Sequence, residues 1–120
     1  GASSVFFGSS VSYANSVKTN ILKVSPETIE RFGAVSEQCA KEMANGVLLS
    51  IGCDIAISFT GIAGPGGGSP TKPVGTVGVG WATRELNSSK IYHHRGNREA
   101  LKEKFCRTGL FKLLDLIRDY

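Results

Sequence analysis

Residues 36–60 are SEQCAKEMANGVLLSIGCDIAISFT, a helix pattern followed at once by a strand pattern. Ser36 can cap the helix, because its hydroxyl can accept a hydrogen bond from a free backbone N–H of the first turn. Gly52 can end the helix, since glycine adopts the left-handed conformation without strain. The apolar positions of the helix recur at the spacing of a buried face and are Ala40, Met43, Ala44, Val47, Leu48 and Ile51.

The strand expected over residues 54–60 has two faces of different character. Ile55, Ile57 and Phe59 form one face, and Ala56 and Ser58 form the other. A strand with no charged face is typical of the centre of a sheet that is covered on both sides. We therefore expect both faces of this strand to be buried.

The rest of the chain continues this alternation of strands and helices. The further elements that we expect are strands over 5–13, 74–83 and 89–95, a helix capped by Asn15, a helix from Pro26 to Gly33 and a helix capped by Asn97. Gly78 and Gly80 share one face of the strand over 74–83, where glycine lets a helix or a ligand approach closely. The pattern indicates a three-layer α/β/α sandwich around a mixed sheet, and the 120 residues make one domain, 1–120.

The same periodicities predict the core. Nine residues are expected to be buried, namely Ala40, Met43, Val47, Leu48, Ile55, Ile57, Val77, Val79 and Leu113. The last helix is expected to bury Leu101, Phe105, Leu110, Leu113, Leu114 and Ile117.

Composition and charge restrict the partners. The formal net charge is +4, with basic residues spread along the chain, which suits a small anionic substrate better than nucleic acid. No apolar run approaches the roughly 20 residues that cross a bilayer, so we expect no membrane partner. Three cysteines at wide spacings fit neither a disulfide framework nor a zinc site and point to a reducing, cytoplasmic compartment. We expect no metal and no organic cofactor, and a homo-oligomer stays open.

A glycine-rich loop follows the central strand directly. Residues 60–68 are TGIAGPGGG, and the backbone N–H groups of Gly61, Gly64 and Gly66 could hold an anion at the carboxyl end of a strand. The loop is not a Walker A motif, because no Gly-Lys-Ser/Thr follows, and Pro65 interrupts any dinucleotide fingerprint. The alternative is a connection that merely turns the chain.

Tyr13, Asn15 and Lys18 form a second group, at a strand end that runs into a helix. One helical turn places Asn15 and Lys18 on the same side. A lysine beside a phenol in a partly desolvated cleft can serve as a base, whereas the simpler interpretation is a solvated lysine next to a core tyrosine. Thr60 could act as nucleophile or hydrogen-bond donor, although a strand hydroxyl is usually structural.

Arg98 forms a third candidate, in the first turn of the last helix. A cation there opposes the helix macrodipole, which favours a position facing an anion such as a ligand phosphate. Simple solvation of the guanidinium is the alternative.

Five short motifs together resemble a known family. They are Tyr-Ala-Asn-x-x-Lys at 13–18, Gly-Ala-Val-Ser at 33–36, the glycine-rich loop at 60–68, Lys-Pro-Val-Gly-Thr-Val at 72–77 and Gly-Asn-Arg at 96–98. In this order and spacing they resemble the C-terminal domain of the competence/damage-inducible protein CinA, the nicotinamide-nucleotide amidase family. The resemblance implies hydrolysis of the carboxamide of nicotinamide mononucleotide to nicotinate mononucleotide and ammonia, which recycles pyridine nucleotide.

The resemblance also implies roles for individual residues. Lys18 would be the general base, with Tyr13 and Asn15 as its neighbours, Thr60 and Gly61 in the amide pocket, Gly64 and Gly66 in the substrate loop, and Arg98 on the phosphate. The family carries a Ser-x-Thr-Gly-Gly segment ahead of the position of Gly1, whose serine would be the nucleophile and whose strand and helix would complete the sheet. This sequence lacks that segment, so a non-catalytic module that binds a nucleotide or a partner is the alternative to an amidase.

Overall fold

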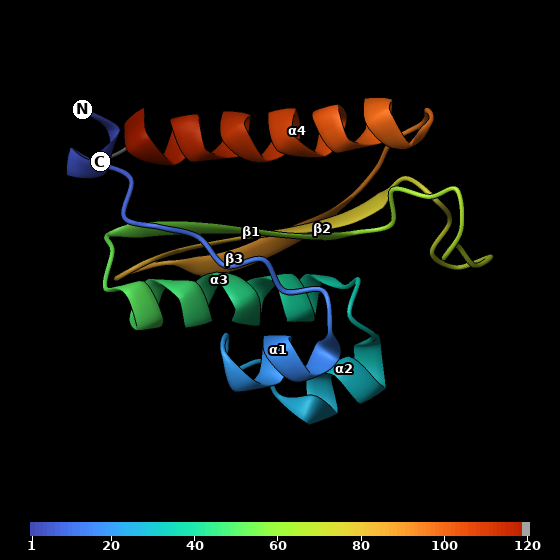
Figure 1. Ribbon diagram of the computed structural model, residues 1–120, viewed down its shortest axis with the longest axis horizontal. Coiled ribbons are helices and arrows are strands. Elements are labelled where there is room, and N and C mark those ends of the chain that lie inside the picture. Colours follow the sequence, from blue (N-terminus) through green and yellow to red (C-terminus); the bar gives the residue numbers. More distant parts are fainter. Residues whose placement is uncertain (119–120) are drawn as a thin grey trace.

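The computed structural model describes residues 1–118 and contains a layered α/β domain. In chain order the elements are η1 (Ala2–Ser4), α1 (Asn15–Asn20), α2 (Pro26–Phe32), α3 (Glu37–Ile51), β1 (Ile55–Gly61), β2 (Thr76–Thr83), β3 (Asn87–His93) and α4 (Arg98–Arg118). The sheet lies between α4 on one face and α3 on the other, and α1 and α2 cover the far side of α3 (Figure 1). The predicted α/β/α layering is confirmed.

The sheet itself is antiparallel throughout the part of the chain that the structure describes. The strand order is β1-β2-β3, with Ile57 opposite Trp81 in the first pair and Gly80 opposite Ser89 in the second. The expected mixture of parallel and antiparallel pairs is not found. The physical reason is that the strand expected over residues 5–13 does not form, and only that strand would have led through helices back into the sheet.

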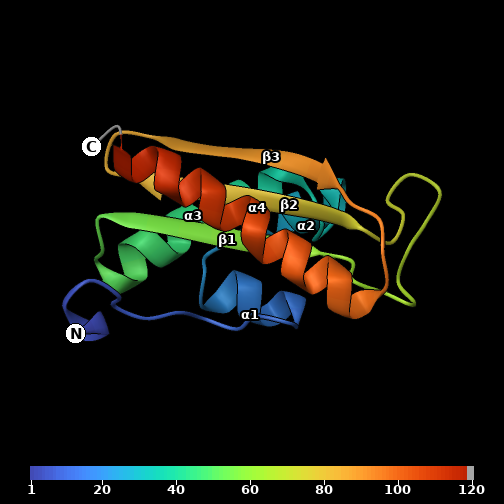
Figure 2. The same cartoon turned by 90° about the horizontal axis from the view of Figure 1, so that it is seen from above.

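Residues 5–13 instead run as a coil beside the outer edge of β1 (Figure 2). Val5, Val11 and Tyr13 are 82%, 78% and 85% exposed, so the β-branched and aromatic side chains that predicted a strand have nothing to pack against. A strand is stable only when a neighbour completes its hydrogen-bond ladder. The local pattern was insufficient because, in the part of the chain that the structure describes, residues 5–13 form no hydrogen-bond ladder with β1, the strand beside them.

The helix boundaries agree with the sequence, and the caps agree in part. The Ser36 hydroxyl accepts a 3.1 Å hydrogen bond from Cys39 N, and Gly52 ends α3 in the left-handed conformation. The Asn97 side chain caps α4 through a 3.0 Å bond from Ala100 N. Asn15 is not a cap, because α1 begins on Asn15 itself and Ala14 accepts the first helical hydrogen bonds.

The two glycines of β2 bring α3 into direct backbone contact with the sheet. A Cβ at Gly80 would lie 2.0 Å from the carbonyl oxygen of Ala40, and one at Gly78 would lie 2.8 Å from that of Ser36. The Ser58 hydroxyl of β1 donates a 2.6 Å hydrogen bond to the same Ala40 carbonyl. The expectation that a helix would approach this glycine face is confirmed.

The core prediction is confirmed for five of its nine residues. Ala40, Met43, Leu48, Val77 and Val79 are buried, whereas Val47, Ile55, Ile57 and Leu113 are half-buried. On α4, Leu101 and Phe105 are buried as expected, but Leu110, Leu114 and Ile117 are 59%, 41% and 53% exposed.

The cause of the difference is the path of α4, which crosses the sheet obliquely (Figure 2). Leu101 and Phe105 pack on Val77, Val79 and Trp81 of β2, so this helix closes over the middle of the sheet. The Ile55–Phe59 face of β1 is therefore covered only in part, and the prediction that β1 would be closed on both faces is wrong.

In residues 1–118, no helix is both long enough and apolar enough to span a bilayer.

We expect Gly80→Ala to destabilise the fold by about 2 kcal/mol or more, because the new methyl group would collide with a backbone carbonyl that cannot rotate away. Urea unfolding followed by circular dichroism measures the change. Gly66→Ala is the matched control, since nothing lies within 4 Å of the added Cβ, and it should stay within about 0.5 kcal/mol of the parent. Equal stability of the two variants would contradict the close approach of α3.

Candidate active site

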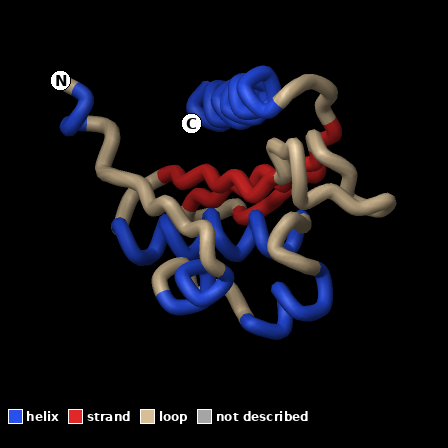
Figure 3. The backbone as a smooth tube through the Cα atoms, turned by 45° about the vertical axis from the view of Figure 1, so that its right-hand side comes forward, coloured by secondary structure: helices blue, strands red, loops and turns tan. Residues whose placement is uncertain are grey.

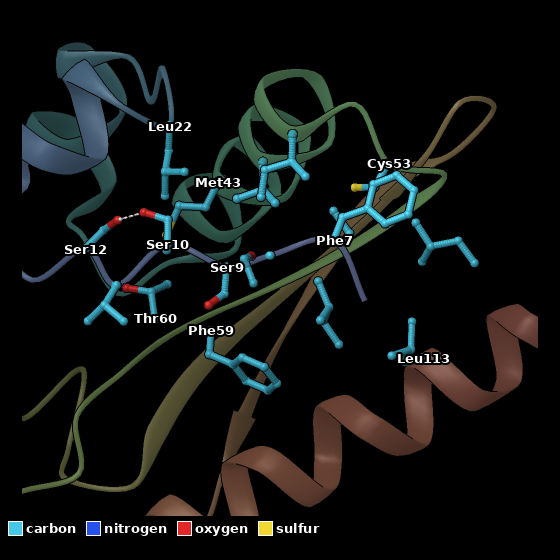
Figure 4. A pocket seen from close by; sticks show the side chains of 18 of the residues that line it. Phe7, Ser9, Ser10, Ser12, Leu22, Met43, Cys53, Phe59, Thr60 and Leu113 are labelled. Carbon is cyan, nitrogen blue, oxygen red and sulfur yellow. Dashed lines mark hydrogen bonds between the residues drawn. The ribbon is translucent and has the colours of Figure 1, made fainter. Parts of the chain in front are cut away.

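A cavity of about 1150 Å³ extends along the outer edge of β1, between that strand and the coil over residues 5–13. Leu113 of α4 contributes to its wall, as does the turn between α2 and α3. Phe7 and Cys53 lie together toward one end of the cavity, and Ser12 and Thr60 lie toward the other (Figure 4). The first end is apolar and the second carries the hydroxyl groups, so polar chemistry belongs to the second end.

Lys18 is the buried cation of this polar end. Its side chain is only 7% exposed, and Nζ donates hydrogen bonds of 2.7 Å to the carbonyl of Ser12 and 3.1 Å to that of Tyr13. Two carbonyls fix the amino group and leave its third position, an N–H in the charged form or a lone pair in the neutral form, for a group in the cavity. The sequence placed Lys18 correctly beside Tyr13, but the contact is with the backbone of Tyr13 and not with its phenol.

Tyr13 and Asn15 line the same cavity from the start of α1. The Tyr13 side chain is 85% exposed, so its phenol can reorient toward a ligand at small cost. Asn15 is exposed at the first helical position, one turn before Lys18. The predicted grouping of Tyr13, Asn15 and Lys18 around one space is therefore present.

Thr60 and Gly61 approach the cavity from the end of β1. Thr60 is 6% exposed, and its hydroxyl donates a 2.7 Å hydrogen bond to the carbonyl of Ala34. Gly61 is tightly packed, since a Cβ there would lie 3.0 Å from both Phe105 and Val77. The structure thus brings five predicted site residues to one cavity, namely Tyr13, Asn15, Lys18, Thr60 and Gly61. The Thr60 hydroxyl, however, already donates its proton to a backbone carbonyl.

The glycine-rich loop leads away from the cavity after Gly61. Gly64, Gly66 and Arg98 do not line the cavity, and the loop projects beyond the end of the sheet (Figures 1 and 2). The Arg98 guanidinium donates a 2.9 Å hydrogen bond to the carbonyl of Gly64. Gly64 has φ +77°, and a Cβ there would lie 2.6 Å from Val74, so this position requires glycine. Arg98 therefore holds the loop and does not reach the lysine end of the cavity.

Two groups of lining residues were not assigned by the sequence. One is the turn of Ala34 and Val35, and the other is the hydroxyl run of Ser9, Ser10 and Ser12. Both groups belong to loops, the class of segment that Figure 3 draws in tan, where periodicity carries no signal. The available signal for the turn was Gly33 three residues before the Ser36 cap, which fixes a bend between two helices.

Cys39 lies on α3, near the charged groups of Lys18, Glu42 and Lys72, and is fully buried. The pKa of its thiol is raised to about 11, first by burial and also by Glu42, while Lys18 and Lys72 act in the opposite direction. Desolvation dominates, so the thiol stays protonated at neutral pH. Within residues 1–118, no three His, Cys, Asp or Glu side chains gather closely enough to hold a metal ion.

Comparison with known proteins points to one family. A family model described as "CinA C-terminal domain" matches residues 1–117. A CinA-like protein of Leptospira biflexa is 45% identical over 122 residues, which cover 98% of this chain and 28% of that protein. One from Chlorobaculum tepidum is 45% identical over 125 residues, covering 99% of this chain and 29% of its own length. The chain therefore spans a little over a quarter of these curated relatives.

Solved structures agree with this assignment. A CinA superfamily protein of Escherichia coli matches with a TM-score of 0.82 and 36% identity, over 87% of this chain and 60% of that one. A competence/damage-inducible protein of Agrobacterium tumefaciens matches with a TM-score of 0.80 and 40% identity, over 88% and 65% of the two chains.

We expect the three thiols to react with a maleimide reagent in the order of their exposure. Cys106 is exposed, Cys53 is half-buried and Cys39 is buried. At about pH 8 only about one Cys39 thiol in a thousand is ionised, because its pKa is about 11. Cys106 should therefore react first and Cys39 last. Peptide mass spectrometry after timed labelling measures the order, and all three should react in denaturant. Early labelling of native Cys39 would contradict the packing of α3.

Proposed function

The chain belongs to the CinA C-terminal domain family, and from this membership and the cavity we propose that it serves in the hydrolysis of nicotinamide mononucleotide to nicotinate mononucleotide and ammonia. The observation that carries the proposal is Lys18, a buried amino group held by two carbonyls in the wall of a cavity that it shares with Tyr13 and Thr60. In its neutral form the amine can donate its two N–H bonds to these carbonyls and keep its lone pair free, which is what a general base requires.

In the proposed reaction a hydroxyl oxygen attacks the carboxamide carbon while Lys18, in its neutral form, takes the hydroxyl proton. The carbonyl oxygen becomes an oxyanion that backbone N–H groups stabilise. Collapse of this intermediate breaks the C–N bond, and the proton returns from Lys18 to the leaving nitrogen, which departs as ammonia. Water then cleaves the resulting ester by the same base and yields the carboxylate.

The attacking hydroxyl would come from the Ser-x-Thr-Gly-Gly segment that the family carries upstream. The cavity has room for more than a nucleotide, because it follows the whole of β1 and has an apolar end at Phe7 and Cys53. We assign the polar end to the carboxamide and to the serine of the upstream segment, and the apolar end to the rest of that segment. Arg98 lies outside the cavity and is bonded to the Gly64 carbonyl, so we assign it no contact with the phosphate.

Ammonia release from nicotinamide mononucleotide tests the proposal, measured on this chain and on the full-length protein that contains it. We expect stoichiometric ammonia and nicotinate mononucleotide from the full-length protein and far less from residues 1–120 alone. The products can be identified by chromatography. Release by neither protein would contradict the proposal and favour a module that binds without catalysis.

Lys18→Ala in the full-length protein should lower kcat by at least about a hundredfold and change KM little, because a base acts in the transition state. Steady-state kinetics measures both constants. Lys41→Ala, at an exposed position of α3, is the matched control and should retain the parental kcat. Turnover of Lys18→Ala within about threefold of the parent, with its fold intact by circular dichroism, would show that Lys18 is not the base.

A further inference from the structure

The turn between α2 and α3 is held by its backbone carbonyls in an uncommon way. Three consecutive carbonyls each accept a hydrogen bond from a side chain, and the three donors come from three different parts of the fold. The pairs are Lys72 Nζ to Phe32 O, Ser36 Oγ to Gly33 O at 2.8 Å, and Thr60 Oγ1 to Ala34 O at 2.7 Å. We call this arrangement the carbonyl clamp.

The hydroxyl part of the clamp is buried, and its Lys72 part is exposed. Ser36 and Thr60 are 5% and 6% exposed, so water does not compete strongly for their hydroxyl groups. The hydrogen bond from Lys72 to the Phe32 carbonyl is charge-assisted and lies at the surface. Gly33 has φ +83°, a conformation that favours glycine, and a Cβ there would lie 2.8 Å from Lys72 Nζ and displace it. The clamp therefore restrains the turn from several sides.

Fixing these carbonyls also fixes the amide protons behind them. A peptide group is planar and trans, so its N–H points opposite to its C=O. The clamped carbonyls of Gly33 and Ala34 therefore set the directions of the N–H groups of Ala34 and Val35. Among residues 1–118, no protein group accepts a hydrogen bond from either of these N–H groups, and both residues line the cavity. They are two preoriented donors without a partner.

We propose that Thr60 and Lys72 are positioning residues, which hold the N–H groups of Ala34 and Val35 as the donors that receive the carboxamide oxygen of the substrate. The inference rests on the proposed function and deepens it, because it supplies the oxyanion donors that amide hydrolysis requires. It also changes the role of Thr60. The Thr60 proton already belongs to the Ala34 carbonyl, so this hydroxyl acts through the turn and does not attack the substrate.

The binding step can be tested on residues 1–120, without catalysis. Nicotinamide mononucleotide is titrated into isotope-labelled protein, and the amide resonances are followed by NMR. We expect the Ala34 and Val35 N–H resonances to shift on binding in the parent and to shift far less in Thr60→Val and in Lys72→Met. Thr60→Ser should restore the shifts, because serine keeps the donor. Binding that moves other amides but leaves these two unchanged would overturn the inference and leave the proposed function intact.

The catalytic step is tested in the full-length protein with a double-mutant cycle. Thr60→Val and Lys72→Met should each lower kcat by about tenfold to a hundredfold with little change in KM, since displaced donors weaken the transition state. Because both act through one turn, the double variant should lose less than the product of the single losses. A loss confined to Thr60→Val, with Lys72→Met at parental turnover, would overturn the inference and make Thr60 a reacting group.

The rigidity of the turn separates failure of the inference from failure of the proposed function. Both single variants should lower the NMR order parameters of the Ala34 and Val35 amides, whether or not the protein hydrolyses an amide, because the turn loses one of its restraints. Unchanged order parameters in both variants would overturn the clamp. Absence of ammonia release by the parent, with lowered order parameters in the variants, would reject the amidase while the clamp stands.

Discussion

The close approach of α3 to the sheet is the constraint on which the other features depend. Gly78 and Gly80 leave no side chain between the helix backbone and β2, and Ser58 bonds directly to the Ala40 carbonyl. This contact fixes the start of α3 as well as its middle, because the Cβ space of Gly78 is occupied by the Ser36 carbonyl. The turn that precedes Ser36 is thereby held against the end of β1, and the polar end of the cavity acquires a rigid wall.

The parts of the fold that the sequence predicted are those with local causes. The helix from Ser36 to Gly52 follows from a cap, an apolar period and a terminating glycine, and all three operate within the segment. The coil over residues 5–13 has strand-forming side chains, but a strand needs a neighbour that no local pattern can supply. The exposed side of α4 was missed for a similar reason, since its amphipathic pattern does not reveal the angle at which it crosses the sheet.

The candidate site likewise contains a local grouping that the sequence predicted and contacts between distant elements that it did not. Asn15 and Lys18 were placed together because one helical turn separates them, and the structure puts both on the cavity. The bond from Thr60 to Ala34 joins residues 26 positions apart, and the bond from Arg98 to Gly64 joins residues 34 apart. Such pairings depend on packing between elements, so a hydroxyl or guanidinium that looks reactive in the sequence can prove to be a tether for the backbone.

The unpaired outer edge of β1 has a consequence for the handling of the isolated chain. The free N–H and C=O groups of this edge can form hydrogen bonds with any extended segment. The adjacent Phe6 and Phe7 are 62% and 60% exposed. An open strand edge beside apolar side chains is the template on which aggregates grow. Aggregation of the chain at high concentration would therefore begin at this edge, and a single charged residue introduced along it would oppose such pairing without touching the packing of α3.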